Sequence, residues 1–570
     1  MIKFKIVVTI YFSISSFLYG AGVRSGGLLS KYQKAMDVKH YSLNLRVDPH
    51  TKSISGATSI LFLLKNKVRF LEIDLHKTFV VSGVSINGTS LGFERKDHKI
   101  IIDNPGIDLA VLHSLDIKYG GRPPVAKRPP WDGGFTWEKS ESGDPWVGVS
   151  CQANGAYIWY PCKEHPSDKA DSAEITITAP DPLMAVSNGL LISKEQLPDR
   201  WTSWRWKTRY PISTYNINIT LGNFEVVEEE AYILDTPLKT VYYVLPEAKK
   251  GAKELLTLSE EYLNFYAKYF GQYPWIKEKF GLVHTPYWGM EHQSINAYGN
   301  DYNKTKLGYD FILLHEMGHE WWGNYLSVAD WSDFWIHEGF DTYSEALFVE
   351  DKYGRSKAIG FVKEQFKKNI KNEHPIVTGE NGTSQHLAGN DVYYKGAHIL
   401  HMLRYLIGDK VFKPTLKEFV QMPKELGENQ TSTKEFVSLV NENTNSNLQW
   451  FFDVYIYQNK LPVLNIKETK GPKHSFADFW WENKNIFRSE TEIALYRNSF
   501  ISVSKQFLSR LNPGIKRKSA HCETEKWPAK RESTVPERAI PFRGRGWRPA
   551  RAPSAPPAPG VGPRPSGRRA

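Results

Sequence analysis

Cysteine is scarce in this sequence, with only three residues in 570, at Cys151, Cys162 and Cys522. A structural zinc site built from four cysteines is therefore excluded. Cys151 and Cys162 could form a disulfide if the protein is exported, or both could be buried thiols. Spacing alone does not decide between these alternatives.

Long hydrophobic runs are also rare. The apolar run Ile6–Leu18 follows two lysines and is too short to span a bilayer comfortably. Small residues follow at Gly20 and Gly22, at the spacing that a signal peptidase prefers. We therefore predict a secretory signal peptide over residues 1–22 and a periplasmic or extracellular protein. No later stretch could serve as a membrane helix, so no transmembrane segment is expected after cleavage.

Acidic residues are few at the C-terminal end. From residue 516 to 570 there are 14 lysines and arginines against 4 acidic residues, a net charge of +10 out of +11 for the whole chain. Proline is frequent there, and such a composition cannot build a core. We predict a disordered basic tail over residues 514–570 that is irrelevant to catalysis. The alternative, a basic arm for nucleic acid, suits an exported protein poorly, and we expect no nucleic-acid partner.

The rest of the chain has a globular composition, with 41% hydrophobic and 13% aromatic residues. Alternating apolar residues, as in YSLNLRV, predict strands over residues 23–227. Residues 228–460 become mixed and then mostly helical. A short β segment is expected over residues 461–513. The predicted fold class is therefore a multidomain α+β protein.

The most informative motif is H-E-x-x-H at His315, Glu316 and His319. No proline interrupts residues 309–353. In a helix, positions i and i+4 share one face, so the two imidazoles could bind one metal ion while Glu316 faces a bound water. Glu338, with eighteen residues between it and His319, could supply a third ligand from a second helix and leave the fourth position open. This set predicts one catalytic zinc ion per chain.

Two further residue patterns refine this prediction. A metzincin would have glycine and histidine three and six places after His319, where this chain has Trp322 and Tyr325. Glu345, seven residues after Glu338 on the same helical face, is a candidate for orienting a ligand imidazole. The alternative for Glu345 is an ordinary surface glutamate.

Together, the stretches HEMGHEWWGN and WIHEGFDTY resemble the zinc site of the aminopeptidase N and leukotriene hydrolase family of gluzincins. WGMEHQ, at Trp288–Gln293, resembles the G-x-M-E-N exopeptidase motif of that family, and YYKG, at Tyr393–Gly396, resembles its Y-E-K-G motif. The resemblance covers roughly Asp37 to Leu464 and is nearest to the smaller bacterial secreted members. It implies an N-terminal β-saddle domain and a thermolysin-like, mostly helical catalytic domain.

The resemblance also implies roles for residues outside the metal motif. Tyr393 would donate to the oxyanion, and Glu291 would pair with the α-ammonium group of the substrate. Substrate-binding positions would be Gly289, Met290, Gln152 and Ala153. Cys162 matches a family position that is usually a buried thiol.

Two positions depart from the exopeptidase motif. Trp288 stands where the family has glycine, and His292 stands where it has asparagine. The first change could narrow the approach to the site, and the second removes an amide that usually contacts the substrate backbone. Neither removes the carboxylate of Glu291.

The function expected from these motifs is that of a secreted, monomeric zinc aminopeptidase acting on peptides with a free N-terminus. Two alternatives stay open: epoxide hydrolysis, as in the leukotriene hydrolases, and a zinc-binding surface protein without catalysis. A protein that had lost catalysis would be expected to have lost Glu316, Glu291 or Tyr393, and all three are present.

Overall fold

The computed structural model describes residues 24–152, 154–384, 389–422 and 429–460, and the backbone of four later strands. These strands are β25 (Leu464–Lys470), β26 (Ser475–Trp481), β27 (Ala494–Arg497) and β28 (Phe500–Val503). They lie in the region where a short β segment is predicted. The predicted signal peptide, the predicted basic tail and Ala153 lie outside the described residues.

The N-terminal part is built on an eight-stranded sheet whose strands alternate buried and exposed side chains. Along β1, for example, Tyr41, Leu43 and Leu45 are buried, as the alternation in the sequence predicts. In spatial order the strands are β14 (Leu190–Leu197), β15 (Trp201–Thr208), β12 (Ser172–Pro180), β1 (Met36–Asp48), β2 (Ser53–Leu64), β8 (Leu112–Gly121), β4 (Phe79–Ile86) and β5 (Thr89–Ser90).

Smaller sheets complete this β-rich part. They are β13 (Met184–Val186), β17 (Thr220–Gly222), β10 (Pro145–Ser150) and β9 (Gly134–Lys139); β3 (Phe70–Asp74), β7 (Lys99–Asp103) and β6 (Phe93–Lys96); and β11 (Lys169–Ala170) with β16 (Ile212–Ser213). The few helical turns are α1 (Lys31–Lys34), η1 (Ala156–Ile158), η2 (Pro198–Arg200) and η3 (Thr214–Asn216).

A five-stranded sheet opens the second part of the chain. Its strands are, in order, β18 (Glu225–Ile233), β19 (Thr236–Val244), β20 (Phe280–His284), β22 (Asn296–Tyr298) and β21 (Gly289–Met290). Strand β21 is an edge strand and carries Gly289 and Met290 of the exopeptidase-like motif. A further pair of strands is β23 (Ser327–Val328) with β24 (Gln430–Thr431).

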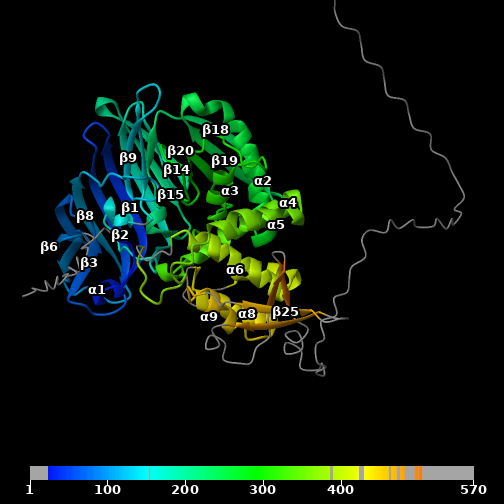
Figure 1. Cartoon of the computed structure of the whole chain (residues 1–570). Coiled ribbons are helices and arrows are strands. Elements are labelled where there is room, and N and C mark those ends of the chain that lie inside the picture. The colour runs from blue at the N-terminus through cyan, green and yellow to red at the C-terminus, as the bar shows by residue number, and fades with distance from the viewer. Residues whose placement is uncertain are drawn as a thin grey trace, which may run out of the picture. The chain divides into compact units, whose positions relative to one another are not determined.

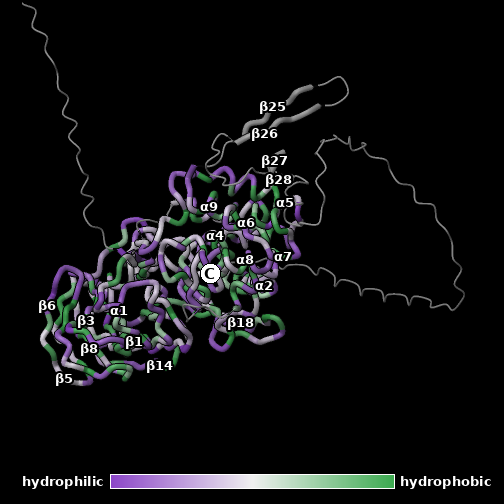
Figure 2. Tube along the Cα trace, turned by 90° about the horizontal axis from the view of Figure 1, so that it is seen from below, coloured by the Kyte–Doolittle hydropathy of each residue, from purple (hydrophilic) through white to green (hydrophobic). Residues whose placement is uncertain are grey.

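Helices form the rest of this part, and most of them gather around α4 (Figures 1 and 2). They are α2 (Ala252–Phe270), α3 (Phe311–Gly318), α4 (Trp335–Tyr353), α5 (Arg355–Phe361), α6 (Asp391–Ile407), α7 (Asp409–Gln421), α8 (Thr433–Thr444) and α9 (Gln449–Tyr455), with short turns η4 (Pro246–Gly251) and η5 (Trp331–Asp333) and the π-helical turn η6 (Val362–Lys367). The predicted order of a β-rich domain followed by a mostly helical one is thus confirmed.

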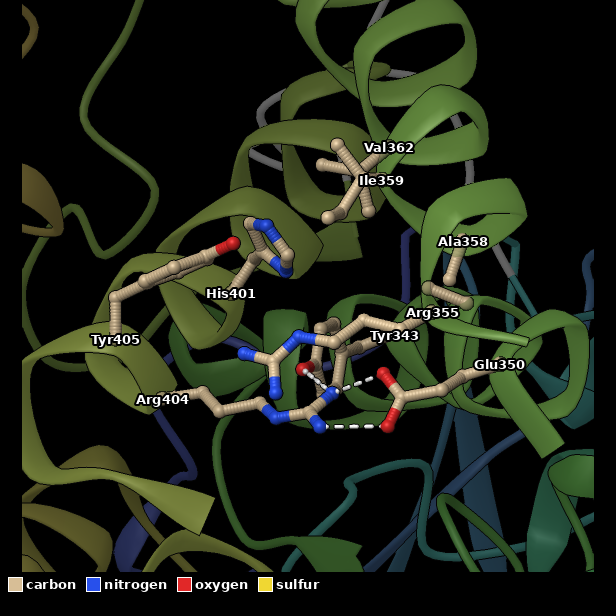
Figure 3. Close-up of a pocket in the computed structure, with 10 residues that line it drawn as sticks. Tyr343, Glu350, Arg355, Ala358, Ile359, Val362, His401, Arg404 and Tyr405 are labelled. Atoms are coloured by element: carbon tan, nitrogen blue, oxygen red, sulfur yellow. Dashed lines mark hydrogen bonds and ion pairs between the residues drawn. The ribbon is translucent and has the colours of Figure 1, made fainter. Parts of the chain in front are cut away.

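Helices α4 and α6 approach each other closely because glycines face each other at the contact. A Cβ atom on Gly396 would lie 3.1 Å from the Cα atom of Gly339. Near the C-terminal end of α4, Arg404 of α6 donates to both carboxylate oxygens of Glu350, each at 2.7 Å (Figure 3). Both residues line a pocket that contains none of the predicted site residues. These contacts fix α6, which carries Tyr393, against the helix that carries Glu338.

The first described residues, which follow the predicted signal peptide, connect the β-rich part to the helical part. The Ser25 hydroxyl donates to Glu164 Oε1 at 2.6 Å and accepts a hydrogen bond from Trp331 Nε1 at 2.9 Å. The Ser25 carbonyl accepts from the Ser384 N–H at 3.0 Å. Because Glu164 lies in the β-rich part and Ser384 precedes α6, this segment ties the two parts together.

Cys151 and Cys162 are free, buried thiols, and burial raises the pKa of each well above its ordinary value. The disulfide alternative is therefore wrong, and the buried-thiol alternative is correct. Among the described residues, the helices are too short or too polar to cross a bilayer.

Candidate active site

Helix α3 presents the H-E-x-x-H motif, and its start is fixed by a capping carboxylate. Asp310 accepts hydrogen bonds from the Leu313 N–H at 3.1 Å and from the Tyr298 hydroxyl at 2.5 Å. The helix ends at Gly318, and His319 is the capping residue that follows it, with its N–H directed at the His315 carbonyl at 3.4 Å. The two histidines therefore lie one turn apart on one face.

Three potential ligand atoms converge at this face. His315 Nε2 and His319 Nε2 lie 3.3 Å apart. Glu338 Oε2, from the first turn of α4, lies 3.7 Å from the first nitrogen and 3.5 Å from the second. The structure thus brings the three predicted metal ligands together from two helices.

The hydrogen bonds on the other side of each imidazole ring define which nitrogen carries a lone pair. His319 Nδ1 lies 2.8 Å from the Trp322 carbonyl, which can only accept, so Nδ1 carries the proton. His315 Nδ1 lies 2.9 Å from Asp341 Oδ2, so the same holds there. In the neutral rings both Nε2 lone pairs then face each other, and Glu338 Oε2 makes no hydrogen bond to any described residue. Three electron-pair donors around one point fit a zinc ion.

Asp341 offers a different ligand set, since ligand atoms of His315, His319 and Asp341 lie within 4.8 Å of one another. Geometry argues against it, because Asp341 contacts Nδ1 of His315, the nitrogen that points away from Nε2. Asp341 also accepts a hydrogen bond from the Tyr266 hydroxyl at 3.2 Å. Asp341 therefore lies on the Nδ1 side of the imidazole and does not complete the Nε2 triangle.

Glu345 lies beside Asp341 and is also buried, with Oε1 3.2 Å from His315 Nδ1. Two carboxylates thus flank the same nitrogen of His315. Sequence reasoning singled out Glu345 but missed Asp341, although Asp341 lies three residues after Glu338, on the same face of the helix. The shorter contact belongs to Asp341.

The site is strongly negative. Burial lowers the pKa of His319, but Glu338 and Glu291 outweigh that effect and raise it to about 10. Burial likewise opposes a charge on His315, yet Asp341 and Glu345 raise its pKa well above the ordinary value. The same field that favours protonated imidazoles in a metal-free chain would favour a divalent cation between them.

Glu316 is buried, and its position depends on a glycine in the exopeptidase-like motif. A Cβ atom on Gly289 would lie 2.3 Å from Glu316 Oε1, so a larger residue there would displace this carboxylate from its present position. Burial raises the pKa of Glu316, and the charges of Glu291 and Glu338 raise it further. A carboxylate that readily holds a proton is suited to general base and acid chemistry.

Glu291 is also buried and contacts the β-rich part of the chain. Its Oε1 accepts a short hydrogen bond from Gln152 Nε2. Its backbone carbonyl accepts from Asn216 Nδ2 at 3.0 Å and from Asn324 Nδ2 at 2.9 Å. Burial raises the pKa of Glu291, while the imidazole of His319 opposes that rise. The structure therefore joins Gln152 and Glu291, which are 139 residues apart.

Glu320, which sequence reasoning missed, holds the loop that follows Glu291. Its Oε1 accepts from the Ser294 N–H at 2.9 Å and from Asn296 Nδ2 at 3.1 Å. Its Oε2 accepts from Trp275 Nε1 at 2.6 Å and from Asn324 Nδ2 at 3.1 Å. The only signal for it in the sequence is an acidic residue in an otherwise aromatic stretch directly after His319.

Tyr393 and Tyr394 face different parts of the site. The Tyr393 ring stacks beside the His315 ring, with centroids 6.2 Å apart. Burial, followed by the charges of Glu338 and Glu291, raises the pKa of Tyr393 well above its ordinary value. For Tyr394 the rise in pKa comes from burial and then from Glu345, on the other side of His315. Tyr393 is thus the tyrosine beside the potential ligand atoms.

The two departures from the exopeptidase motif differ in exposure. His292 is buried, burial lowers its pKa to about 3, and its Nδ1 makes no hydrogen bond to a described residue. Trp288 is 48% exposed and donates from Nε1 to Asn300 Oδ1 at 3.1 Å. The neighbouring Met290 is buried.

Comparisons with known protein families agree with this arrangement. Residues 37–216 match the Peptidase M1 N-terminal domain, and residues 255–455 match the Peptidase family M1 domain. Human glutamyl aminopeptidase is 24% identical over 476 residues, which cover 76% of this chain and 47% of that protein. The chain thus spans about half or less of the length of the curated relatives it matches.

Solved structures share the fold. An M1 zinc metallopeptidase from Deinococcus radiodurans aligns with a TM-score of 0.65 at 22% identity, covering 75% of this chain and 95% of that one. A mutant of that enzyme bound to a Tyr-Ser-Ala substrate aligns with a TM-score of 0.63, also at 22% identity, covering 75% of this chain and 96% of that one. Yeast LTA4 hydrolase aligns with a TM-score of 0.61 at 20% identity, covering 76% of this chain and 69% of that one.

Proposed function

The chain belongs to peptidase family M1. We propose that it is an exported, zinc-dependent aminopeptidase that removes N-terminal residues from peptides. One observation carries the proposal: His315 Nε2, His319 Nε2 and Glu338 Oε2 converge on one point, with the buried carboxylates of Glu316 and Glu291 beside it. Export is supported by the sequence pattern of residues 1–22.

His315, His319 and Glu338 would hold the zinc ion. When bound, zinc supplies Lewis-acid activation of water and of the scissile carbonyl. Glu345 and Asp341, on the Nδ1 side of the His315 ring, would keep its Nε2 free to bind the ion. His319 and Glu338 are buried and His315 is partly buried.

Glu316 is assigned the proton transfers. Its carboxylate would accept a proton from the attacking water and deliver it to the leaving amine. Burial raises its pKa towards the value at which both transfers are efficient. Tyr393, beside His315, would donate its hydroxyl proton in a hydrogen bond to the developing oxyanion.

Glu291 is assigned the recognition of a free N-terminus. A carboxylate pairs with an α-ammonium group through charge-assisted hydrogen bonds. Gln152 holds one oxygen of Glu291 in place from the β-rich part. A buried carboxylate that pairs with the free amine would favour substrates that begin at that amine, which is the preference of an exopeptidase.

The test combines zinc analysis with a panel of aminoacyl chromogenic substrates, each with a free and an acetylated amine. We expect one zinc ion per chain and hydrolysis of the free-amine forms alone. Rapid internal cleavage of blocked peptides would show an endopeptidase, and stoichiometric zinc without hydrolysis of any substrate would show a binding protein.

A further inference from the structure

We propose that Trp131 and Trp288 form an aromatic clamp that selects peptides with a large apolar or aromatic side chain just beyond the scissile bond. This inference rests on the proposed aminopeptidase function and adds the substrate class to it. The two indole rings come from different parts of the chain, and their centroids lie 6.3 Å apart at an interplanar angle of 61°.

Both rings are unusually exposed for tryptophan. The exposed fraction is 62% for Trp131 and 48% for Trp288. Single exposed apolar residues are ordinary, but two large rings in contact form a patch that can bury further apolar surface. Tryptophan is also the residue type that most often dominates binding energy at recognition surfaces.

Hydrogen bonds connect Trp288 to the helix that carries the metal-binding motif. Its Nε1 donates to Asn300 Oδ1, and Asn300 Nδ2 in turn donates to Asp310 Oδ1 at 2.8 Å. Asp310 is the residue that caps helix α3, which carries His315. The indole is therefore coupled by two hydrogen bonds to the start of the metal-binding helix.

Trp131 lies in a loop that is hydrogen-bonded to the segment of Gln152. Its neighbour Gly133 donates its N–H to Asn154 Oδ1 at 2.6 Å, two residues after Gln152. Gln152 is the residue that contacts Glu291. Trp288 thus belongs to the segment that bears Glu291, and the loop of Trp131 is hydrogen-bonded to the segment that bears Gln152.

The order of residues along the edge strand β21 indicates which part of a peptide would reach the clamp. Glu291 would bind the amine, and a Cβ atom on Gly289 would meet Glu316, the residue assigned to the scissile bond. Trp288 directly precedes this two-residue strand and Glu291 directly follows it, a separation of about 10 Å if the chain is extended. A peptide lying along this edge would therefore place its second and third residues, on the leaving side of the scissile bond, near Trp288.

The chemistry of the clamp favours apolar partners. An aromatic side chain between or against two indoles gains both buried area and ring–ring contacts. Glycine or aspartate at the same position would gain neither. The family motif has glycine at position 288, so this selectivity would be specific to chains that carry an aromatic residue there.

The experiment compares tripeptides that share the first residue and vary the second and third between phenylalanine, glycine and aspartate. For each enzyme, kcat/KM on the peptide is divided by kcat/KM on the corresponding amino-acid amide, which has no side chain beyond the scissile bond. We expect the ratio for phenylalanine to exceed that for glycine by about tenfold or more in the parent protein. Trp288→Gly and Trp131→Ala should each reduce this preference about 5- to 10-fold, and Trp288→Phe should retain part of it.

Trp450→Ala is the matched control, because Trp450 is also exposed but lies on α9. The preference of this variant for phenylalanine over glycine should equal that of the parent. The double variant should lose little more than either single variant, since the rings act together. An unchanged preference in Trp288→Gly, with peptides still hydrolysed, would overturn this inference alone. Failure of the zinc-loaded parent to release the first residue of any peptide would instead overturn the proposed function.

Discussion

The metal-facing half of the site and the peptide-facing half are built differently. In the metal-facing half, His315, His319 and Glu338 come from two packed helices, and the second nitrogen of each imidazole is held by an acceptor. In the peptide-facing half, Gln152 and Glu291 meet across two parts of the chain. The tryptophans beyond them are largely exposed.

Because the two halves are built differently, mutations in them should affect the kinetics differently. Interactions made only with the transition state affect kcat, and those made equally with bound substrate affect KM. Changes in the metal-facing half should therefore slow hydrolysis of every substrate alike. Changes in the peptide-facing half should depend on which peptide is offered.

The largest effect is expected for Glu316→Gln, which keeps the shape of the side chain but removes the base. We expect kcat to fall by roughly 10²–10⁴ on all substrates, because proton transfer loses its carrier. Zinc content should stay at one per chain, since Glu316 is not among the three converging ligands. Steady-state kinetics together with metal analysis measure both; activity near that of the parent would remove Glu316 from the mechanism.

The next largest effect concerns the two tyrosines. Tyr393→Phe should lower kcat by roughly 10²–10³ with KM little changed, the usual loss for one oxyanion donor. Tyr394→Phe, the matched control, should stay within about threefold of the parent because its hydroxyl lies outside the site. A severe defect in Tyr394→Phe with a mild one in Tyr393→Phe would reverse the assignment of the donor.

Glu291→Gln tests the peptide-facing half. Loss of the charge should lower kcat/KM on free-amine substrates by about 10- to 150-fold, the equivalent of one charge-assisted hydrogen bond. The discrimination between free and acetylated amines should shrink with it. If activity falls equally on free-amine and acetylated substrates, Glu291 contributes to the hydrolytic step and not to recognition of the amine. The two halves of the site would then not be functionally separate.

The smallest effect is expected for Glu320→Gln. The new amide group would face N–H donors that the carboxylate now accepts, so the loop after Glu291 should shift. We expect kcat/KM to fall about 3- to 10-fold, mostly through KM, with zinc content unchanged. Glu254→Gln, in an exposed ion pair with Lys304, is the control and should have no effect. A loss of zinc in Glu320→Gln would place Glu320 in the metal-facing half.

The same contrast explains how much could be predicted from the sequence. His315, His319 and Glu338 lie within 24 residues, and the helical repeat alone places the two histidines on one face. The β-rich then helical fold followed from strand alternation and from the family resemblance. These features depend on local periodicity.

The parts that were missed depend on contacts between distant segments. Asp341 and Glu345 are both spaced plausibly on α4, and only the packing of α3 on α4 shows that Asp341 makes the shorter contact with His315. Glu320 has its partners on three separate segments. The contact of Trp131 with Trp288 joins residues 157 positions apart. No periodicity in the sequence encodes such contacts.

The most direct test of the metal-facing half is zinc-edge anomalous diffraction from crystals of the zinc-loaded protein. We expect one peak about 2.0–2.2 Å from His315 Nε2, His319 Nε2 and Glu338 Oε2, with His315 Nδ1 still bound to Asp341. A peak between His315 Nδ1 and the Asp341 carboxylate, or no peak at the Nε2 triangle in protein that hydrolyses peptides, would contradict the assignment.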